Sequence, residues 1–158
     1  MRLKIVCPGK ARGPFGELAR EYEKRIAAYA QVALIEAPEV RYVKEPAPKA
    51  RDRILAEEAL GIKAKLDARD HVIALDVRGR RLTSEEFAAY IGDHATRGVS
   101  NFAFVIGGSL GLDAALLAKA NLCLSLSSMT LPHLLARVVL LEQIYRACTI
   151  LRGEPYHK

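Results

Sequence analysis

The chain alternates short apolar runs with longer segments whose apolar residues recur at helical spacing, and this alternation constrains its fold most. The runs hold few polar side chains and cover residues 3–7, 32–37, 72–77, 102–106 and 122–126. Such nearly unbroken apolar runs are typical of strands that are buried on both faces of a sheet. Strands that alternate with helices form parallel sheets with helices on both sides. The sequence therefore predicts an α/β fold built on a parallel sheet.

Helix signals and turn residues place the other elements. Thr83 and Glu86 have the spacing of a capping box, which predicts that a helix begins there. Pro46 and Pro48 stand among charged residues and predict an exposed loop over residues 39–50, and Arg78-Gly79-Arg80 predicts a turn after the third strand. Helices are predicted from Gly13-Pro14 to residue 26, over 51–66, from Thr83 to near Gly98, briefly from Asp113, and over 134–151.

The length and charge of the chain limit its class. A chain of 158 residues has the usual size of one domain, so residues 1–158 are predicted to form a single unit. A chain of this size buries enough apolar surface to fold without disulfides or a structural metal, and its 51% of hydrophobic residues is an ordinary globular share. The net charge of +6 favours a polyanionic partner, although a protein that merely happens to be basic fits this charge equally well.

The three cysteines, Cys7, Cys123 and Cys148, are far apart and odd in number. No Cys or His spacing matches a zinc site, so no metal is expected. This pattern suits a reducing compartment. The N-terminal apolar stretch is too short for a signal peptide, and no segment approaches the roughly 18 apolar residues of a membrane span. We therefore expect a cytoplasmic protein without membrane contact.

The loops at the carboxyl ends of the strands are where parallel sheets bind ligands, and one of them is rich in glycine. Gly107 and Gly108 directly follow a buried strand, and adjacent glycines let the backbone approach a ligand with no Cβ in the way. The spacing through Gly111 does not fit the dinucleotide-binding fingerprint, and no acidic residue follows at the distance needed to hold a ribose. A tight strand–helix turn explains the glycines equally well.

The loop over residues 127–133 lies between a buried strand and a long helix, and it is the more informative of the two loops. It can offer backbone N–H and C=O groups to an adenine, with Met129 and Leu131 as apolar walls. Alternatively, Thr130 caps the following helix, with Leu131 or Pro132 in its first turn. Capping explains Thr130 and Pro132 but gives no reason for the whole hydroxyl-rich stretch.

The last predicted helix carries two pairs of polar side chains. His133 and Arg137 are four residues apart and share a helix face, and Glu142 and Arg146 have the same spacing. These groups could take part in acid–base or anion-binding chemistry. A solvated helix face with an intrahelical ion pair explains the same spacing, and we favour it on this pattern alone.

The C-terminal tail, residues 152–158, brings aromatic, imidazole and cationic groups together in Tyr156, His157 and Lys158. Terminal tails are usually frayed. A tail with these groups could instead stack on a nucleic acid base and clamp it.

Several segments of the second half are similar to those of a known family. They are Phe104–Leu112 (FVIGGSLGL), Leu124–His133 (LSLSSMTLPH) and Arg137–Ala147 (RVVLLEQIYRA), and the ending Arg152–Lys158 (RGEPYHK) completes the match. On these segments the chain resembles the RlmH family, ribosomal RNA large subunit methyltransferase H, in the SPOUT class of methyltransferases. The likeness runs the full length, including the strand end at Leu75-Asp76, and is most specific in the C-terminal third.

The resemblance implies an α/β parallel-sheet SPOUT fold with a C-terminal trefoil knot, in a homodimer. It also implies methylation of N3 of a pseudouridine in 23S rRNA within assembled ribosomes, with S-adenosyl-L-methionine as the methyl donor. The donor would lie in the knot and contact the residues matching Leu75, Gly107, Leu126, Ser127, Ser128, Met129, Thr130 and Leu131.

The implied reaction sets requirements for the catalytic residues. N3 of pseudouridine carries a proton that must leave before the nitrogen can attack a methyl group, so a base or a stabilising cation is needed. A non-catalytic RNA-binding module and a dinucleotide-binding oxidoreductase are alternatives, and the failed dinucleotide fingerprint argues against the second. The catalytic candidates are the two histidines, which could accept a proton, the two arginines, which could stabilise an anion, and two residues without an assigned role: His133, His157, Arg137, Arg146, Glu142 and Tyr156.

Overall fold

The computed structural model describes all of residues 1–158, and its centre is a sheet of five strands in the order β2-β1-β4-β3-β5. Every neighbouring pair of strands is parallel. The predicted α/β architecture is therefore confirmed, and each of the five apolar runs forms one strand. The strands are β1 (Arg2–Pro8), β2 (Gln31–Ala37), β3 (His71–Arg81), β4 (Asn101–Val105) and β5 (Leu122–Ser125).

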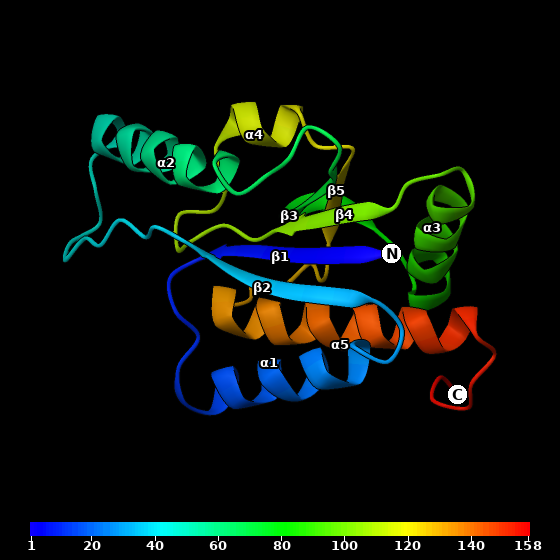
Figure 1. Cartoon of the computed structure of the whole chain (residues 1–158). Helices are drawn as coiled ribbons and strands as arrows, with labels where there is room; N and C mark the ends of the chain where they lie inside the picture. Colours follow the sequence, from blue (N-terminus) through cyan, green and yellow to red (C-terminus); the bar gives the residue numbers. More distant parts are fainter.

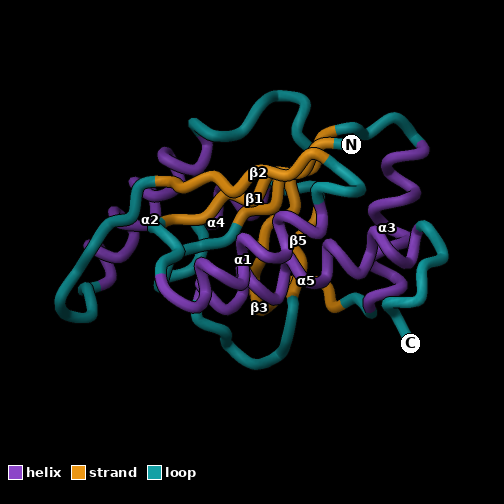
Figure 2. The backbone as a smooth tube through the Cα atoms, turned by 60° about the horizontal axis from the view of Figure 1, so that its bottom comes forward, coloured by secondary structure: helices purple, strands orange, loops and turns teal.

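Helices cover both faces of the sheet (Figure 1). One core cluster joins the sheet to α1, α3 and α5, and a second, smaller cluster joins its other face to α2 and α4. Figures 1 and 2 both show α1 and α5 side by side on the first face. The helices are α1 (Gly13–Ile26), α2 (Pro48–Lys63), α3 (Ser84–Thr96), α4 (Ala114–Ala118) and α5 (His133–Leu151).

The central strand β4 shows why the apolar runs are unbroken. Phe102 and Phe104 belong to the cluster beneath α1, α3 and α5, whereas Val105 belongs to the cluster beneath α2 and α4. All three side chains are fully buried. Successive side chains of a strand point to opposite faces, so a strand that is covered on both sides needs apolar residues at every position.

Local sequence signals, a capping box for α3 and a proline for α2, specify where these two helices begin. The Thr83 hydroxyl accepts a hydrogen bond from the Glu86 N–H, and the Glu86 carboxylate accepts one from the Thr83 N–H, so the predicted capping box is confirmed. Helix α2 runs from Pro48 to Lys63, three residues before the predicted range at both ends. Proline suits the first turn of a helix because it has no N–H to satisfy there.

Helix α5 does not begin as the capping interpretation of the loop 127–133 predicted. Pro132 is the N-cap residue of α5, and no side chain caps this helix, so the prediction that Thr130 caps it is wrong. A residue before proline is biased towards extended backbone, which prevents the helix from starting at Leu131. The hydroxyl group of Thr130 is therefore not needed for the helix.

Strand β3 continues where the sequence predicted a turn. The strand extends to Arg81, and both Leu75 and Arg80 pair with Leu124 of β5, on either side of an irregularity. A Cβ at Gly79 would lie 2.7 Å from the Cys123 carbonyl carbon and oxygen. The absence of a side chain at Gly79 thus lets the backbones of β3 and β5 touch. The prediction of a turn at Arg78-Gly79-Arg80 is therefore wrong, because the glycine serves this close contact instead.

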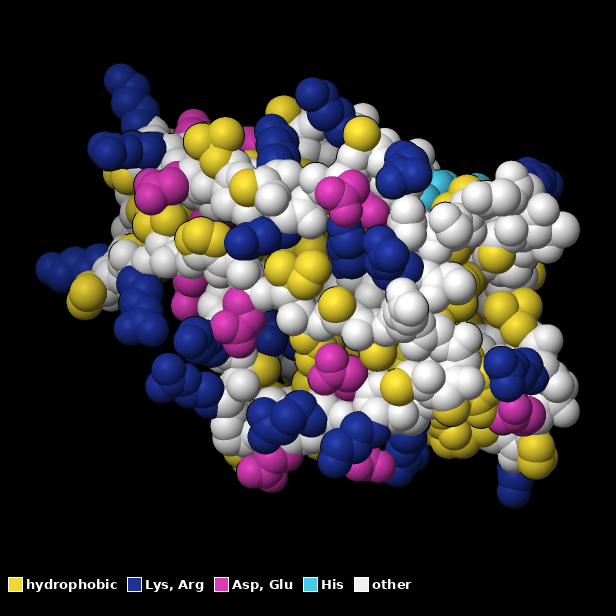
Figure 3. Space-filling view, viewed as in Figure 1, with side chains coloured by type: hydrophobic (Ala, Val, Ile, Leu, Met, Phe, Trp, Pro, Cys, Tyr) yellow, Lys and Arg dark blue, Asp and Glu magenta, His cyan; other side chains and the backbone are white.

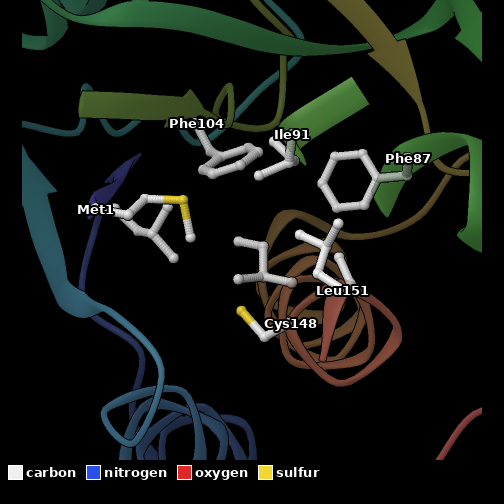
Figure 4. Close-up of a pocket in the computed structure, with 9 residues that line it drawn as sticks. Met1, Phe87, Ile91, Phe104, Cys148 and Leu151 are labelled. Atoms are coloured by element: carbon white, nitrogen blue, oxygen red, sulfur yellow. The ribbon is translucent and has the colours of Figure 1, made fainter. Parts of the chain in front are cut away.

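An apolar pocket lies in the larger core cluster, between α3, α5 and the sheet. Its lining is entirely hydrophobic, and Figure 4 shows Phe87, Phe104, Cys148 and Leu151 around it. Such a site offers no polar group to a substrate. None of the helices combines the length and the hydropathy that are needed to cross a membrane.

Candidate active site

Strand register brings Leu75 of β3 and the loops after β4 and β5 to one edge of the sheet. Ala74 of β3 pairs with Val105 of β4 on one side and with Cys123 of β5 on the other. Neighbouring strands lie about 4.8 Å apart, so residues at similar heights on β4, β3 and β5 are close together. Leu75 follows Ala74 by one position, Gly107 follows Val105 by two, and Leu126 follows Cys123 by three. These three residues therefore lie close together at the carboxyl edge of the sheet.

The loop after β4 is a tight turn. A Cβ at Gly107 would lie 2.4 Å from the carbonyl carbon and oxygen of Gly111, a separation that no side chain tolerates. Gly111 itself has a φ of +87°, in the left-handed region that favours glycine. The tight-turn interpretation of these glycines is therefore correct for the protein's own backbone. A ligand contact at Gly107 is compatible with it and remains a prediction.

A buried carboxylate covers the same loop from α2. The Glu58 side chain would approach a Cβ at Gly108 to 2.9 Å, and its Oε1 accepts a hydrogen bond of 3.1 Å from the Val40 N–H. Burial raises the pKa of Glu58, and the neighbouring carboxylates of Glu39 and Glu57 raise it further. This group anchors the chain after β2 to the glycine loop.

The loop after β5 presents free backbone groups. Ser125 donates to the Ser127 carbonyl at 2.9 Å, and the Ser127 hydroxyl accepts from the Met129 N–H at 3.0 Å, so the loop begins with an ordered turn. The N–H groups of Ser128, Thr130 and Leu131 donate to no other group of the protein. The Met129 side chain is 76% exposed although it is apolar. Backbone donors beside uncovered apolar side chains can hold a flat, polar-edged ligand.

The first turns of α5 hold two of the catalytic candidates in different surroundings. His133, the first residue of the helix, is half-buried and makes no hydrogen bond. Arg137 is only 3% exposed, and its Nη2 donates to the Gly9 carbonyl at 3.2 Å while its Nε has no partner. The interpretation of this face as solvated is therefore wrong for Arg137, which holds the loop after β1 in place.

The middle of α5 and the C-terminal tail form a second polar cluster. Arg146 forms the predicted ion pair with Glu142, at 2.6 Å, and its guanidinium lies 4.6 Å from the centre of the Tyr156 ring. The Tyr156 hydroxyl donates to Glu142 at 3.2 Å. His157 contacts Arg146 at 3.3 Å and Glu85 of α3 at 2.9 Å. The tail therefore docks on its own chain in this structure rather than fraying.

The surroundings shift the ionisation of this cluster. Burial, with help from Tyr22 and Glu142, raises the pKa of Tyr156 to about 12, so its phenol stays protonated near neutral pH. A hydrogen bond from its own backbone N–H, followed by those from His157 and Thr83, lowers the pKa of Glu85 to about 2. The hydrogen bonds with Glu142 raise the pKa of Arg146. The cluster therefore offers a fixed cation and a phenol that keeps its proton and donates a hydrogen bond.

A partly polar pocket lies between the end of β5, the start of α3 and the middle of α5. It has a volume of about 110 Å³ and is lined by Leu126 from the loop, Thr83 from the start of α3 and Gln143 from α5, among others. Gln143 accepts from the Ser84 hydroxyl at 2.7 Å and donates to Glu142 at 2.6 Å. Through Gln143, the pocket wall is thus hydrogen-bonded to Glu142, whose ion pair with Arg146 contacts the C-terminal tail.

The structure divides the predicted site residues into groups. The predicted cofactor residues meet at the carboxyl edge. Four of the six catalytic candidates form the second polar cluster, and the other two lie apart from it at the start of α5: Glu142, Arg146, Tyr156 and His157 against His133 and Arg137. Arg137 and Arg146 are nine positions apart on the helix, which corresponds to roughly 14 Å. Gln143 and Glu85 were not predicted, because a polar residue on a helix carries no signal of its tertiary partner. The capping box at Thr83 was the only local signal for this region, and it predicted the start of α3 but not the partner of Glu85.

Comparison with known proteins identifies the family. The model of the family described as "Predicted SPOUT methyltransferase" matches residues 1–157. The chain is 42% identical, over its full length and that of the relative, to "Ribosomal RNA large subunit methyltransferase H" of Streptococcus equi subsp. zooepidemicus. The protein of the same name from Carboxydothermus hydrogenoformans is 43% identical, again with both chains fully covered.

A solved structure supports the fold independently of close sequence similarity. The "Probable Methyltransferase from Bordetella pertussis Tohama I" superposes with a TM-score of 0.55 over 92% of this chain and 95% of that chain, at 15% sequence identity. This likeness concerns the fold alone. With the full-length relatives, however, the membership is shown: the chain belongs to the SPOUT methyltransferases and, within them, to the ribosomal RNA large subunit methyltransferase H family.

Proposed function

We propose that this protein transfers a methyl group from S-adenosyl-L-methionine to N3 of a pseudouridine in 23S rRNA of assembled ribosomes. The observation that carries the proposal is the full-length match, at 42% and 43% identity, to two relatives named for methylation of large subunit ribosomal RNA. The convergence of Leu75, Gly107 and Leu126 at one edge of the sheet supports it, because a parallel sheet binds ligands there.

The residues at this edge fit the methyl donor. The free N–H groups of Ser128, Thr130 and Leu131 suit the polar edge of an adenine, and Met129 and Leu131 suit its faces. We infer that these groups, with Leu75, Gly107, Leu126 and Ser127, hold the donor. When bound, S-adenosyl-L-methionine supplies a methyl group that is activated by its positive sulfur.

We infer that His133 accepts the proton from N3 of the target base. It is half-buried, has no partner in the protein and directly follows the loop 127–132, so a base held beside the donor is within its reach. His157 is a weaker candidate, because it is already engaged by Arg146 and Glu85. Tyr156 is excluded as a base by its raised pKa of about 12.

We infer that Arg146 and Tyr156 act on the target base from a second copy of the chain. Arg146 is a permanent cation that can stabilise the anion formed at N3, and Tyr156 can stack on the base. Within one chain they lie some 13 residues of helix from His133, roughly 20 Å away, which is too far to share one base. A homodimer would bring the tail of one copy to the donor loop of the other.

Exposed apolar side chains support a homodimer. Phe15 and Leu18 of α1 are 38% and 48% exposed, and Met129 of the donor loop is 76% exposed. Leu134 and Leu135 at the start of α5 are only half-buried. Helix α5 carries apolar residues on all sides, and such a helix is usually covered by protein on all sides. We therefore infer that a second copy covers the beginnings of α1 and α5.

The knot is part of the same proposal. Strand β3 pairs with β5 on both sides of its irregularity, and the backbone at Gly79 touches β5 directly. These contacts hold the end of β3 against β5, the strand that directly precedes α5. We infer that α5 passes through the loop formed by the end of β3.

The proposed function is tested with ribosomal particles that lack methylation at the target pseudouridine. The wild-type protein and labelled donor should place one methyl group at N3 of a pseudouridine, mapped by mass spectrometry of the rRNA. His133→Asn should lower kcat by about 100-fold or more while calorimetric affinity for the donor stays unchanged. Tight particle binding without methyl transfer would instead support a non-catalytic RNA-binding module. Binding of NAD in place of the donor would support an oxidoreductase.

A further inference from the structure

The chain after β2 and the first turns of α2 together form a cationic segment. Residues 41–53, termed the basic arm, contain five Lys or Arg and two acidic residues, which leaves a charge of +3, half of the chain's net +6. Figures 1 and 2 show the arm projecting from the end of the molecule, and Figure 3 shows Lys and Arg side chains gathered at that end. The five cations are all exposed: Arg41, Lys44, Lys49, Arg51 and Arg53.

Four of these five cations form no ion pair within the protein. The only ion pair of the arm joins Arg51 and Glu45 at 3.8 Å. Arg41, Lys44, Lys49 and Arg53 have no acidic partner. A cluster of unpaired cations creates a positive potential that attracts an anionic partner.

Unpaired cations also occur at the start of α2, where the positive end of the helix dipole disfavours them. The first turn of α2 contains no acidic residue, although the positive end of a helix dipole favours acids there. Instead, Lys49 and Arg53 are four residues apart and therefore lie on the same helix face. A local arrangement that opposes the helix dipole indicates a function outside the helix.

The arm is fastened to the proposed donor site. The Tyr42 hydroxyl hydrogen-bonds to Ser109 Oγ at 2.8 Å, and Arg51 Nη2 donates to the Leu110 carbonyl at 3.4 Å. Ser109 and Leu110 belong to the glycine loop that begins at Gly107. The side chain of Val43, between these contacts, is fully exposed although it is apolar. The arm thus stands beside the edge of the sheet where the donor would lie.

We propose that the basic arm is the surface by which this protein grips the phosphate backbone of its RNA substrate. Arg41, Lys44, Lys49 and Arg53 contact phosphates, which position the RNA without reading its sequence. Tyr42 and Arg51 fix the arm against the glycine loop, so that the gripped RNA presents its target base to the donor. The proposal rests on the proposed function and assigns one region of the chain to its RNA substrate.

The test compares two charge reversals of equal size. The arm variant carries Lys44→Glu, Lys49→Glu and Arg53→Glu. The control variant carries Lys63→Glu, Lys65→Glu and Arg69→Glu, three exposed and unpaired cations that lead into the opposite, amino-terminal edge of the sheet. Methyl transfer to ribosomal particles is measured over a range of salt concentrations, and donor affinity and thermal unfolding are measured beside it.

The arm variant should raise KM for the particles by roughly tenfold or more, with kcat and donor affinity unchanged. The dependence of log kcat/KM on log salt should become shallower by about three, one for each lost phosphate contact, whereas the control variant keeps the wild-type slope. Equal effects of both variants would overturn the proposal. If the wild-type protein transfers no methyl group, the proposed function fails, and sedimentation of the same variants with particles still tests the arm, because only the arm variant should lose binding.

Discussion

A single exposed carboxylate, Glu85, joins the C-terminal tail to α3. It follows the N-cap Thr83, where the positive end of the helix dipole and the free N–H groups stabilise negative charge. His157 adds a hydrogen bond of 2.9 Å to the same carboxylate. Glu85 therefore contributes to the stability of both the helix start and the docked tail.

The pH dependence of this contribution follows from the direction of the pKa shift. The pKa of Glu85 falls from 4.5 to about 2 in the folded protein, so its stabilising effect is present above 4.5 and is lost as the pH falls towards 2. Thermal unfolding of the wild type and of Glu85→Gln should differ at neutral pH, and the difference should shrink over that window. A difference that stays constant down to pH 2 would contradict this assignment.

At the scale of elements, the turns after the strands depend on backbones that touch without side chains. Gly107 lies against Gly111, and Gly79 lies against Cys123 and Leu124 of β5. Both contacts occur near the carboxyl edge of the sheet, where the site is formed. The glycines were correctly singled out by the sequence, but a turn and a close approach of two backbones have the same sequence signal.

Gly107→Ala should therefore destabilise the fold itself. The new Cβ would lie 2.4 Å from backbone atoms of Gly111, and relieving this clash should cost about 3 kcal/mol of unfolding free energy. The control is Gly98→Ala, where a φ of +95° disfavours alanine by about 1 kcal/mol but no atom lies within 4 Å. Urea unfolding measures both. Equal losses for the two variants would show that the loop after β4 can open.

At the scale of the whole molecule, the proposed reaction needs two chains. The donor loop and His133 lie at the start of α5, whereas the tail docks beside Glu142 and Arg146 further along the helix. No bend in a 19-residue helix brings these ends together. Each complete site would therefore combine the loop of one copy with the tail of the other.

A mixture of two inactive variants tests this arrangement. One chain lacks residues 155–158, and the other carries His133→Asn with an intact tail. Each homodimer should keep its donor affinity but lose methyl transfer, because one lacks the stacking group and the other the base. Heterodimers should recover up to about half of the activity per dimer, since one of their two sites is complete. Verified heterodimers without activity would show that the tail serves its own chain, and full activity of the truncated homodimer would exclude the tail from catalysis.

The sequence by itself determined the parts of this protein that depend on near neighbours in the chain. Apolar periodicity specified the five strands, and the capping box at Thr83 specified the start of α3, because both are local signals. The segments around Gly107 and Met129 were similar enough to a known family to indicate a methyltransferase. The spacing of Glu142 and Arg146 also predicted their ion pair.

Tertiary structure alone decided what depends on residues far apart in the chain. Arg137 was expected on a solvated face, yet it is buried against Gly9, 128 positions away. The docking of His157 on Glu85 and the fastening of the arm through Tyr42 to Ser109 likewise join separate elements. A side chain's burial and partner depend on which elements the sheet order brings together, and that order, β2-β1-β4-β3-β5, follows from packing of the whole core rather than from any local pattern.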